Sequence, residues 1–198
     1  MLTKRCFDLF LTIPGVIFLM PVFLLISIWI KIDSSGPVFF RQQRVGKAGA
    51  LFAIYKFRTM IVDAEKQGKQ ITIGADRRIT LSGQFLRKYK LDELPQLINV
   101  LKGEMSLVGP RPEVPRYVEE YPEHIREIVL SIPPGITDYA SIEYRNENDV
   151  LGCSTDPERT YIEEVLPIKL KYYVQYVKER SLWLDFVLLI RTFIVIIK

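Results

Sequence analysis

The 198-residue chain is long enough to form one domain with a hydrophobic core. Hydrophobic residues make up 48% of it and charged residues 25%, a combination that indicates apolar residues concentrated in one segment. The formal net charge of +4 favours an anionic partner, such as a phosphate ligand, acidic lipid or nucleic acid. One histidine, and two cysteines without C-x-x-C spacing, argue against a structural zinc site.

The first segment is an apolar run over residues 9–30 that contains no charged residue. About 20 such residues span a bilayer core, so a single transmembrane helix is one interpretation. Pro14 and Pro21 interrupt the run, however, and basic residues flank both of its ends, so the positive-inside rule gives no direction. The second interpretation is a re-entrant helix that breaks near Pro21 and leaves on the face where it entered. Either one argues against a nucleic-acid partner, which only the net charge supports.

The next segment, residues 38–60, predicts a β-hairpin. Two stretches rich in Val, Ile, Phe and Tyr are separated by a turn that contains Gly46 and Gly49. The polar residues 61–80 predict a short helix followed by a surface loop, and residues 82–89 predict a helix with Phe85 and Leu86 facing inward.

The stretch from Arg87 to Pro112 concentrates the residues suited to catalysis. The adjacent carboxylates Asp92 and Glu93 follow several basic residues and precede a helix that Gly103 should end. Pro95 is tolerated in a first turn, so we expect this helix to begin near Asp92. Asp92 is then either an ordinary N-cap or part of a metal-assisted site for phosphate, and the two interpretations are compatible.

The remaining chain predicts further short helices. Pro115 and Pro122 divide residues 113–130 into one or two helices, and residues 131–137 form a rigid connection. Residues 160–178 predict a helix kinked at Pro167. Residues 182–197 are too short for a span and include two charges, so we expect an interfacial or core-docked helix.

A series of short motifs resembles the bacterial sugar transferases, specifically the catalytic domain of the monotopic phosphoglycosyl transferases. The resemblance runs nearly end to end. Its motifs are Lys4-Arg5 with Asp8, Ile54-Tyr55-Lys56-Phe57-Arg58-Thr59-Met60, Leu91-Asp92-Glu93-Leu94-Pro95-Gln96, Asn99-Val100-Leu101-Lys102-Gly103-Glu104-Met105-Ser106, Gly109-Pro110-Arg111-Pro112 and Pro134-Gly135-Ile136-Thr137.

This resemblance implies an enzyme that transfers a phosphosugar from a UDP-sugar to polyprenyl (undecaprenyl) phosphate and releases UMP, the first membrane step of glycoconjugate and polysaccharide synthesis. It implies a ping-pong mechanism with Mg²⁺, a phospholipid membrane as partner, and a monotopic location at the cytoplasmic face of the bacterial inner membrane. By position, the resemblance implies that Asp92 is the nucleophile and that Glu93, together with Asp92, binds Mg²⁺. The residues expected to hold the substrate are Lys56, Arg58, Arg87, Pro110, Arg111 and Pro112.

The fold that follows is α+β and mainly α, a single domain over residues 1–198. We expect residues 1–32 to form a re-entrant membrane helix-break-helix, with Pro21 at the break. Residues 37–198 form the catalytic part, with a short β-hairpin and several amphipathic helices around the active site. Many relatives have Ser-Pro where this chain has Met20-Pro21, which leaves the position of the break open.

The sequence leaves other questions open. Asp138-Tyr139 follow Gly-Ile-Thr where many relatives have Gly and another pattern, so the sugar is not identified. The glycan pathway and the oligomeric state, a homodimer included, are also open. The alternative function is a non-catalytic adaptor at the membrane surface, in which the basic, aromatic-rich hairpin and the terminal helix bind anionic lipid.

Overall fold

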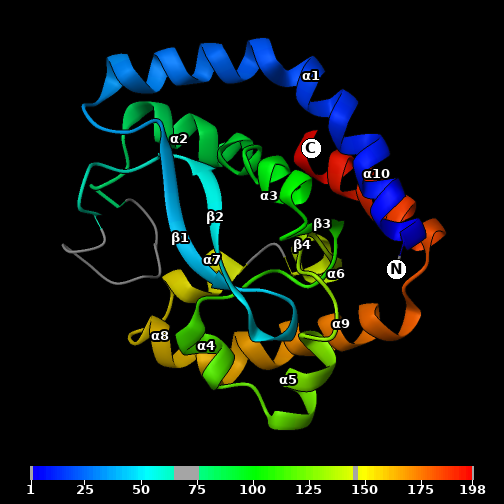
Figure 1. Cartoon of the computed structure of the whole chain (residues 1–198). Coiled ribbons are helices and arrows are strands. Elements are labelled where there is room, and N and C mark those ends of the chain that lie inside the picture. The colour runs from blue at the N-terminus through cyan, green and yellow to red at the C-terminus, as the bar shows by residue number, and fades with distance from the viewer. Residues whose placement is uncertain (1, 65–75, 145–146, 198) are drawn as a thin grey trace.

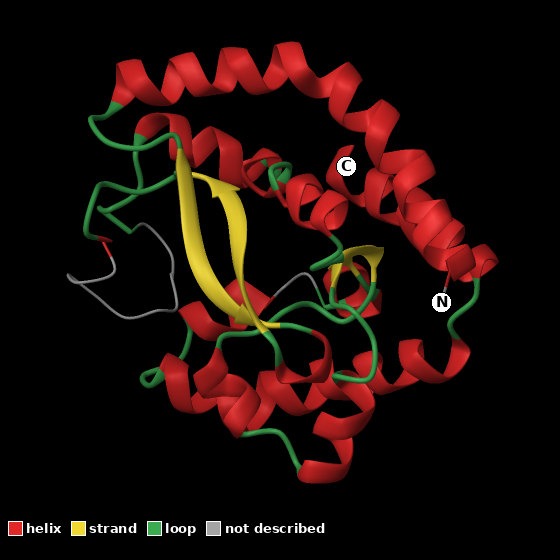
Figure 2. Cartoon of the chain, in the orientation of Figure 1, coloured by secondary structure: helices red, strands yellow, loops and turns green. Residues whose placement is uncertain are grey.

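The computed structural model describes residues 2–64, 76–144 and 147–197 of the chain. The described part is mainly helical with a short β-hairpin, as expected, and Figure 2 shows the hairpin as its main strand element. The elements, labelled in Figure 1, are α1 (Leu2–Asp33), β1 (Phe39–Val45), η1 (Lys47–Gly49), β2 (Leu51–Phe57), α2 (Leu81–Lys88), η3 (Leu91–Glu93), α3 (Gln96–Lys102), β3 (Ser106–Val108), α4 (Pro115–Glu119), α5 (Glu123–Val129), β4 (Gly135–Thr137), α6 (Tyr139–Glu143), α7 (Glu147–Gly152), α8 (Pro157–Thr160), the π-helical turn η4 (Tyr161–Val165), α9 (Leu166–Glu179) and α10 (Leu182–Ile197).

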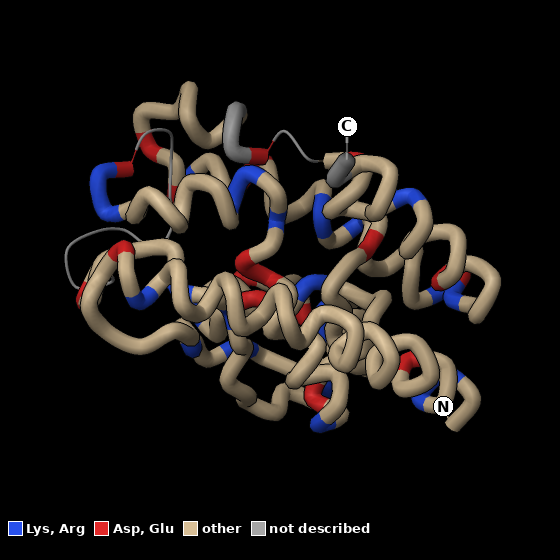
Figure 3. Tube along the Cα trace, turned by 90° about the horizontal axis from the view of Figure 1, so that it is seen from above, with Lys and Arg blue, Asp and Glu red and all other residues tan. Residues whose placement is uncertain are grey.

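The long helix α1 is apolar and largely exposed. By length and composition it is the one helix in the described residues that could cross a membrane. It stays helical through Pro14 and Pro21, so the predicted break at Pro21 is not confirmed, and Figure 1 shows a bent helix instead. A proline removes one backbone hydrogen bond, which a long helix can absorb as a bend. Figure 3 shows charged residues at the N-terminal end of α1 and an uncharged stretch beyond it.

Both ends of α1 are attached to the rest of the protein. At the N-terminal end, Lys4 Nζ lies 2.9 Å from Asp185 of α10, and the Asp8 carboxylate accepts a hydrogen bond of 2.8 Å from Ser106 Oγ. At the other end, Asp33 accepts hydrogen bonds of 2.9 and 2.7 Å from the backbone and side chain of Ser82. The helix therefore arches over α2 and α3 with its two ends on the same body (Figure 1).

The predicted hairpin is confirmed. Strands β1 and β2 pair antiparallel, with Phe39 opposite Phe57 and Val45 opposite Leu51, and the turn residue Gly49 has φ +79. The strands β3 and β4 form a small parallel sheet that the sequence did not predict. A Cβ atom added to Gly135 would lie 2.0 Å from the backbone nitrogen of Gly109, so the glycine permits this close approach.

The helix predicted to begin near Asp92 begins later. A 3-10 turn, η3, holds Asp92 and Glu93, and α3 starts at Gln96 after Pro95. The N-cap positions of η3 and α3 are Lys90 and Pro95, and neither cap has a side-chain hydrogen bond, so the N-cap interpretation of Asp92 is wrong, while Gly103 ends α3 with φ +84 as predicted. Asp92 and Glu93 therefore lie in a separate turn that precedes α3.

Several other expectations were tested by the structure. Residues 81–88 are helical and Leu86 is buried, as expected, but Phe85 is 44% exposed and contacts Trp29 of α1 edge-on. Pro115 starts α4 and Pro122 separates it from α5. Most of the range 61–80, where a short helix followed by a loop was expected, lies outside the described residues. Its described ends are mainly turns, and Ile79 forms an isolated β-bridge with Met60.

The core lies around α9, which runs beneath the hairpin turn in Figure 1. Its residues Tyr173 and Tyr176 are fully buried, and Tyr176 Oη donates to Val108 O and to Asp185. Asp185 is 1% exposed, which confirms that α10 docks on the core along one face. The opposite face exposes a set of large apolar side chains, Leu182, Trp183, Phe186, Ile190, Phe193 and Ile194.

Candidate active site

The backbone of α3 is joined to β2 by one buried side chain. Asn99 is fully buried, accepts a hydrogen bond of 3.0 Å from the backbone nitrogen of Tyr55, and donates one of 2.8 Å to Ala53 O. It also donates to Glu104 at 2.7 Å. Because strand neighbours point to opposite faces, Tyr55 and Lys56 diverge, and Lys56 is directed to the turn that carries Glu93.

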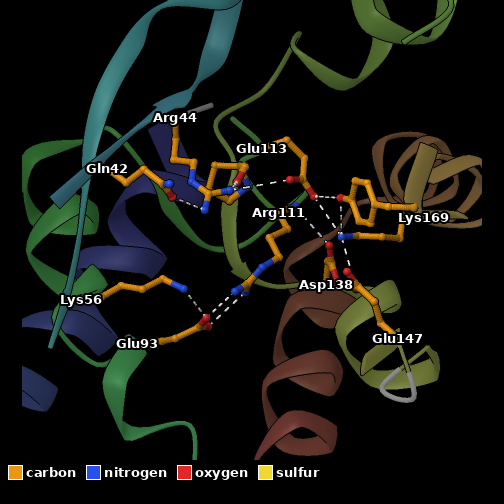
Figure 4. Close-up of polar contacts among 11 residues, drawn as sticks. Gln42, Arg44, Lys56, Glu93, Arg111, Glu113, Asp138, Glu147 and Lys169 are labelled. Carbon is orange, nitrogen blue, oxygen red and sulfur yellow. Dashed lines mark hydrogen bonds and ion pairs between the residues drawn. The ribbon is translucent and has the colours of Figure 1, made fainter. Parts of the chain in front are cut away.

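Glu93 is held between two cations (Figure 4). Its Oε1 lies 2.8 Å from Lys56 Nζ, and Arg111 donates to both carboxylate oxygens, with 3.0 Å between Nη1 and Oε2. Burial opposes the charge of Glu93, but Arg111 and then Lys56 outweigh it and hold the pKa of the carboxyl well below its ordinary value. Glu93 is therefore a carboxylate at any pH at which the protein would work.

Asp92 lies in the opposite electrostatic environment. The residue is 8% exposed, and within the described part of the chain its carboxylate makes no hydrogen bond or ion pair. Burial, and then the negative charge of Glu93, raise the pKa of Asp92 above its ordinary value, against the weaker influence of Lys56, Arg87 and Lys90. One carboxylate is thus paired with two cations, and the other has no hydrogen-bond or ion-pair partner among the described residues.

The loop from Gly109 to Glu113 directs Arg111 into the site. Its backbone nitrogen donates to Asp138 Oδ2 at 3.1 Å, and Pro110 O accepts from Gly135 at 2.9 Å. On its other side, Pro112 O accepts from Arg44 Nη1 at 3.1 Å. The charge of Glu93 raises the pKa of Arg111 further, so its guanidinium stays charged.

Most of the residues that the sequence singled out meet at this site. Lys56 and Arg111 contact Glu93, Asp92 is its neighbour in the same turn, and the positive charge of Arg87 partly opposes the rise in the pKa of Asp92. Arg87 is half-buried, and its Nη1 has no hydrogen-bond partner among the residues described. Such an unpaired buried donor is suited to an anionic ligand.

Arg58, predicted to bind substrate, and Pro21, predicted as the membrane break, lie outside this cluster. Arg58 is 5% exposed and donates to Ser35 O at 2.5 Å and to Ser34 O at 2.7 Å, so its guanidinium is used at the C-terminal end of α1. Pro21 is an exposed residue of α1, far along that helix from its anchored ends. The contacts of Arg58 offer a structural role in place of the predicted substrate contact.

Sequence reasoning did not identify the residues behind the site. Arg44 is one of several basic residues in the predicted hairpin, and Glu113 directly follows the Gly-Pro-Arg-Pro motif, so neither stands out in the sequence. No motif marks Lys169, because its main partner Glu113 lies 56 positions away in the sequence. The one available signal is helical spacing, which places Lys169 on the same face of α9 as Tyr173 and Tyr176 and so indicates that Lys169 faces the core.

The carboxylates fit the needs of a magnesium ion that binds with its substrate. Mg²⁺ is commonly held by one or two carboxylates, with phosphate oxygens and water as its other ligands. Among the described residues the Asp92 carboxylate has no hydrogen-bond or ion-pair partner, and Arg111 and Lys56 favour the ionised form of Glu93. The described residues contain no group of three or more His, Cys, Asp or Glu side chains that could hold a metal alone, so such an ion would need the phosphate.

Comparison with known proteins decides the family. A family model described as bacterial sugar transferase matches residues 1–198.

The chain belongs to the bacterial sugar transferase family.

Named relatives share much of this sequence. One is the UDP-N-acetylgalactosamine-undecaprenyl-phosphate N-acetylgalactosaminephosphotransferase of Aeromonas hydrophila, 38% identical over 96% of this chain and 42% of the relative. Another is the UDP-glucose:undecaprenyl-phosphate glucose-1-phosphate transferase of Escherichia coli, 38% identical over 93% of this chain and 38% of the relative. The exopolysaccharide production protein ExoY of Sinorhizobium fredii is 36% identical over 74% of this chain and 71% of its own length.

The bacterial sugar transferase described here thus spans about two-fifths of the length of the Aeromonas and Escherichia relatives. The aligned part contains the whole candidate site, from Lys56 to Arg111. The names of these relatives share undecaprenyl phosphate and differ in the sugar.

Proposed function

We propose that this sugar transferase moves a phosphosugar from a UDP-sugar to undecaprenyl phosphate, giving undecaprenyl-diphosphate-sugar and UMP. The observation that carries the proposal is the contrast between two adjacent carboxylates: Glu93 is clamped by Lys56 and Arg111, and Asp92 has no partner among the described residues. An unpaired carboxylate next to fixed cations is suited to attack a phosphorus atom whose oxygens those cations neutralise.

The reaction then has two displacements. An oxygen of the Asp92 carboxylate attacks the phosphorus bonded to the sugar, and the bond from that phosphorus to the UMP oxygen breaks, so that UMP leaves with the electron pair. An oxygen of undecaprenyl phosphate next attacks the same phosphorus. The bond to Asp92 breaks, and the free carboxylate is restored. This sequence is a ping-pong mechanism.

The cations orient the nucleotide sugar. Lys56 and Arg111 approach Glu93 from two different elements, and a pyrophosphate placed against them would exchange contacts with that carboxylate. Arg87, with a buried Nη1 atom that lacks a partner in the described residues, would take a phosphate oxygen near Asp92. The fixed positive groups stabilise charge on the leaving phosphate without reorganisation of solvent.

We also propose Mg²⁺ as the cofactor, held by Glu93 and Asp92 together with the pyrophosphate. When bound, the ion would neutralise charge on the pyrophosphate and its leaving oxygen. The two carboxylates would keep it at the junction of both substrates.

We further propose that α1 is re-entrant. Its N-terminal end is tied to Asp185 and Ser106, and its C-terminal end to Ser82, all in one body, while its middle is apolar and exposed. A spanning helix would need those ends on opposite faces of a bilayer of about 30 Å. Basic residues near both ends favour the cytoplasmic face of the bacterial inner membrane.

Release of UMP tests the activity. The protein is incubated with undecaprenyl phosphate, Mg²⁺ and a series of UDP-sugars, and UMP is measured for each sugar. We expect one sugar to give UMP and a lipid-linked product. Binding to anionic vesicles without UMP release from any sugar would favour the membrane adaptor and contradict the proposal.

Cysteine labelling tests the topology. Cys6 and Cys153 are exposed, so both are first replaced by alanine, and single cysteines are then introduced at residues 2 and 35. We expect a membrane-impermeant maleimide to label both positions from the cytoplasmic side. Labelling of the two positions from opposite sides would show that α1 spans the membrane.

A further inference from the structure

A buried ion pair lies behind the loop that carries Arg111 (Figure 4). Glu113 Oε1 accepts hydrogen bonds of 2.9 Å from Lys169 Nζ and 2.7 Å from Tyr161 Oη. Glu113, Lys169 and Tyr161 are 6%, 5% and 3% exposed. The pair joins the loop to α9 and to the π-helical turn that precedes it. Glu113 and Lys169 are separate from the residues that face the candidate substrate.

The loop is fixed at every residue from 109 to 113. Gly109 donates to Thr137 O at 3.0 Å, and Glu113 O accepts from Val45 at 3.0 Å, so the two ends of the loop are held by β4 and β1. Between them, Arg111 donates its backbone N–H to Asp138. The only ionised side chain that the loop sends into the core is that of Glu113, and the Arg111 side chain leaves the loop toward Glu93.

The charges of the pair depend on each other. Burial opposes both, yet Lys169 and then Arg44 hold the pKa of Glu113 below its ordinary value, and Glu113 raises the pKa of Lys169 well above its own. Lys169 Nζ also lies 3.4 Å from Glu147 of α7, and Arg44 Nη1 lies 3.7 Å from Glu113. A charge buried this deeply is retained only with such partners.

We infer that Glu113 and Lys169 are a positioning pair that fixes the Arg111 loop against α9, and so sets the orientation of the Arg111 guanidinium at the site. Neither residue touches the reacting groups, and both act through Arg111. Arg44 supports the same loop from the hairpin by its contact with Pro112 O. The inference rests on the proposed function for its kinetic consequence, because Arg111 is there a ligand of the UDP-sugar.

The test removes both charges together. In Glu113→Gln/Lys169→Met neither member of the pair is left as an unpaired charge, and Arg44 keeps its hydrogen bonds to Pro112 O and Gln42, so the variant is expected to fold. We expect kcat/KM for UMP release to fall about a hundredfold, the scale of a displacement of about 1 Å, mainly through a higher KM for the UDP-sugar. Lys169→Arg, which keeps the charge, should retain most of the activity. Lys171→Met removes an exposed lysine of the same helix and is the matched control.

A double-mutant cycle with Arg111→Ala separates positioning from structure. If the pair acts through Arg111, adding Glu113→Gln/Lys169→Met to Arg111→Ala should lower kcat/KM by no more than about threefold beyond Arg111→Ala alone. Losses that multiply, or an unchanged KM in Glu113→Gln/Lys169→Met, would overturn the inference. Should that variant not fold, Tyr161→Phe removes only the hydroxyl from Glu113 and should raise KM in the same direction; an unchanged KM there overturns the inference too.

A readout without substrate keeps the inference separate from the proposed function. Hydrogen–deuterium exchange at the Arg111 amide, which is bonded to Asp138, should be at least tenfold faster in Glu113→Gln/Lys169→Met than in the wild type and in Lys171→Met. Equal exchange would overturn the inference. If the wild type releases no UMP from any UDP-sugar, the proposed function fails, and the exchange rates still decide whether the pair fixes the loop.

Discussion

Arg111 donates hydrogen bonds to both carboxylate oxygens of Glu93, although the two residues come from a loop and a 3-10 turn that are 18 positions apart in the sequence. With Lys56 on the same carboxylate, the contact leaves the neighbouring Asp92 without a partner in the described residues. The different roles proposed for the two residues, Asp92 as nucleophile and Glu93 as metal ligand, follow from this arrangement.

Asp92→Asn should remove activity while preserving or raising stability. The Asp92 carboxylate is buried beside Glu93 with no partner described, so its charge costs folding free energy. We expect UMP release to fall by about 10³-fold or more and the thermal midpoint to stay equal or rise. Activity assays and thermal unfolding in the same detergent check both. A variant with normal UMP release would remove Asp92 from the mechanism.

The pH dependence should reflect the raised pKa of Asp92. As nucleophile it must be ionised, so the acidic limb of kcat/KM should lie above the ordinary pKa of an aspartate. In the folded protein the proton is bound more tightly than in the unfolded chain. The wild type therefore gains stability relative to Asp92→Asn as the pH falls through this raised pKa. A stability difference that widens on acidification would contradict the prediction.

Glu93→Gln should have the opposite effect on stability. The substitution leaves Lys56 and Arg111 facing each other without the carboxylate that pairs them. We expect a loss of about 1–3 kcal/mol in the free energy of unfolding and a weaker dependence of activity on Mg²⁺. Denaturant unfolding and a Mg²⁺ titration measure the two effects. An unchanged titration would exclude Glu93 as a metal ligand.

Asn99→Ala should weaken the attachment of α3 to β2 and so destabilise the site. Its amide joins Tyr55, Ala53 and Glu104, so alanine leaves part-buried backbone groups of β2 without these partners. We expect a cost of about 1–3 kcal/mol, measured by denaturant unfolding, with a lower rate of UMP release. Gln84→Ala, at an exposed position of α2, is the control and should change neither quantity. Equal effects of the two substitutions would show that Asn99 does not hold the site.

The sequence predicted the parts of the fold that depend on local signals. The hairpin follows from two β-rich stretches and the glycines between them, and the end of α3 follows from Gly103. The contact of β3 with β4 was not predicted, because it joins Ser106 to Gly135 and no local pattern marks a parallel pair of three residues. The bend of α1 without a break was also missed, since prolines show that a helix is perturbed but not how it adapts.

In the candidate site, too, residues in local motifs were predicted and long-range contacts were not. Asp92, Glu93, Lys56 and Arg111 came from motifs, and the structure brings them together. Arg58 belongs to one of these motifs as well, yet it binds the end of α1, because a motif does not distinguish a ligand contact from a buried structural one. Lys169 could not be found, since its role depends on a long-range contact with Glu113.

The most direct test of the account is UMP release in the absence of undecaprenyl phosphate. With UDP-sugar and Mg²⁺ alone, a nucleophilic Asp92 should give a burst of about one UMP per protein molecule, and the phosphosugar should be found on Asp92 by mass spectrometry of the digested protein. Asp92→Asn should give neither signal. Release of UMP by the wild type only when both substrates are present, with no modified Asp92, would contradict the covalent mechanism.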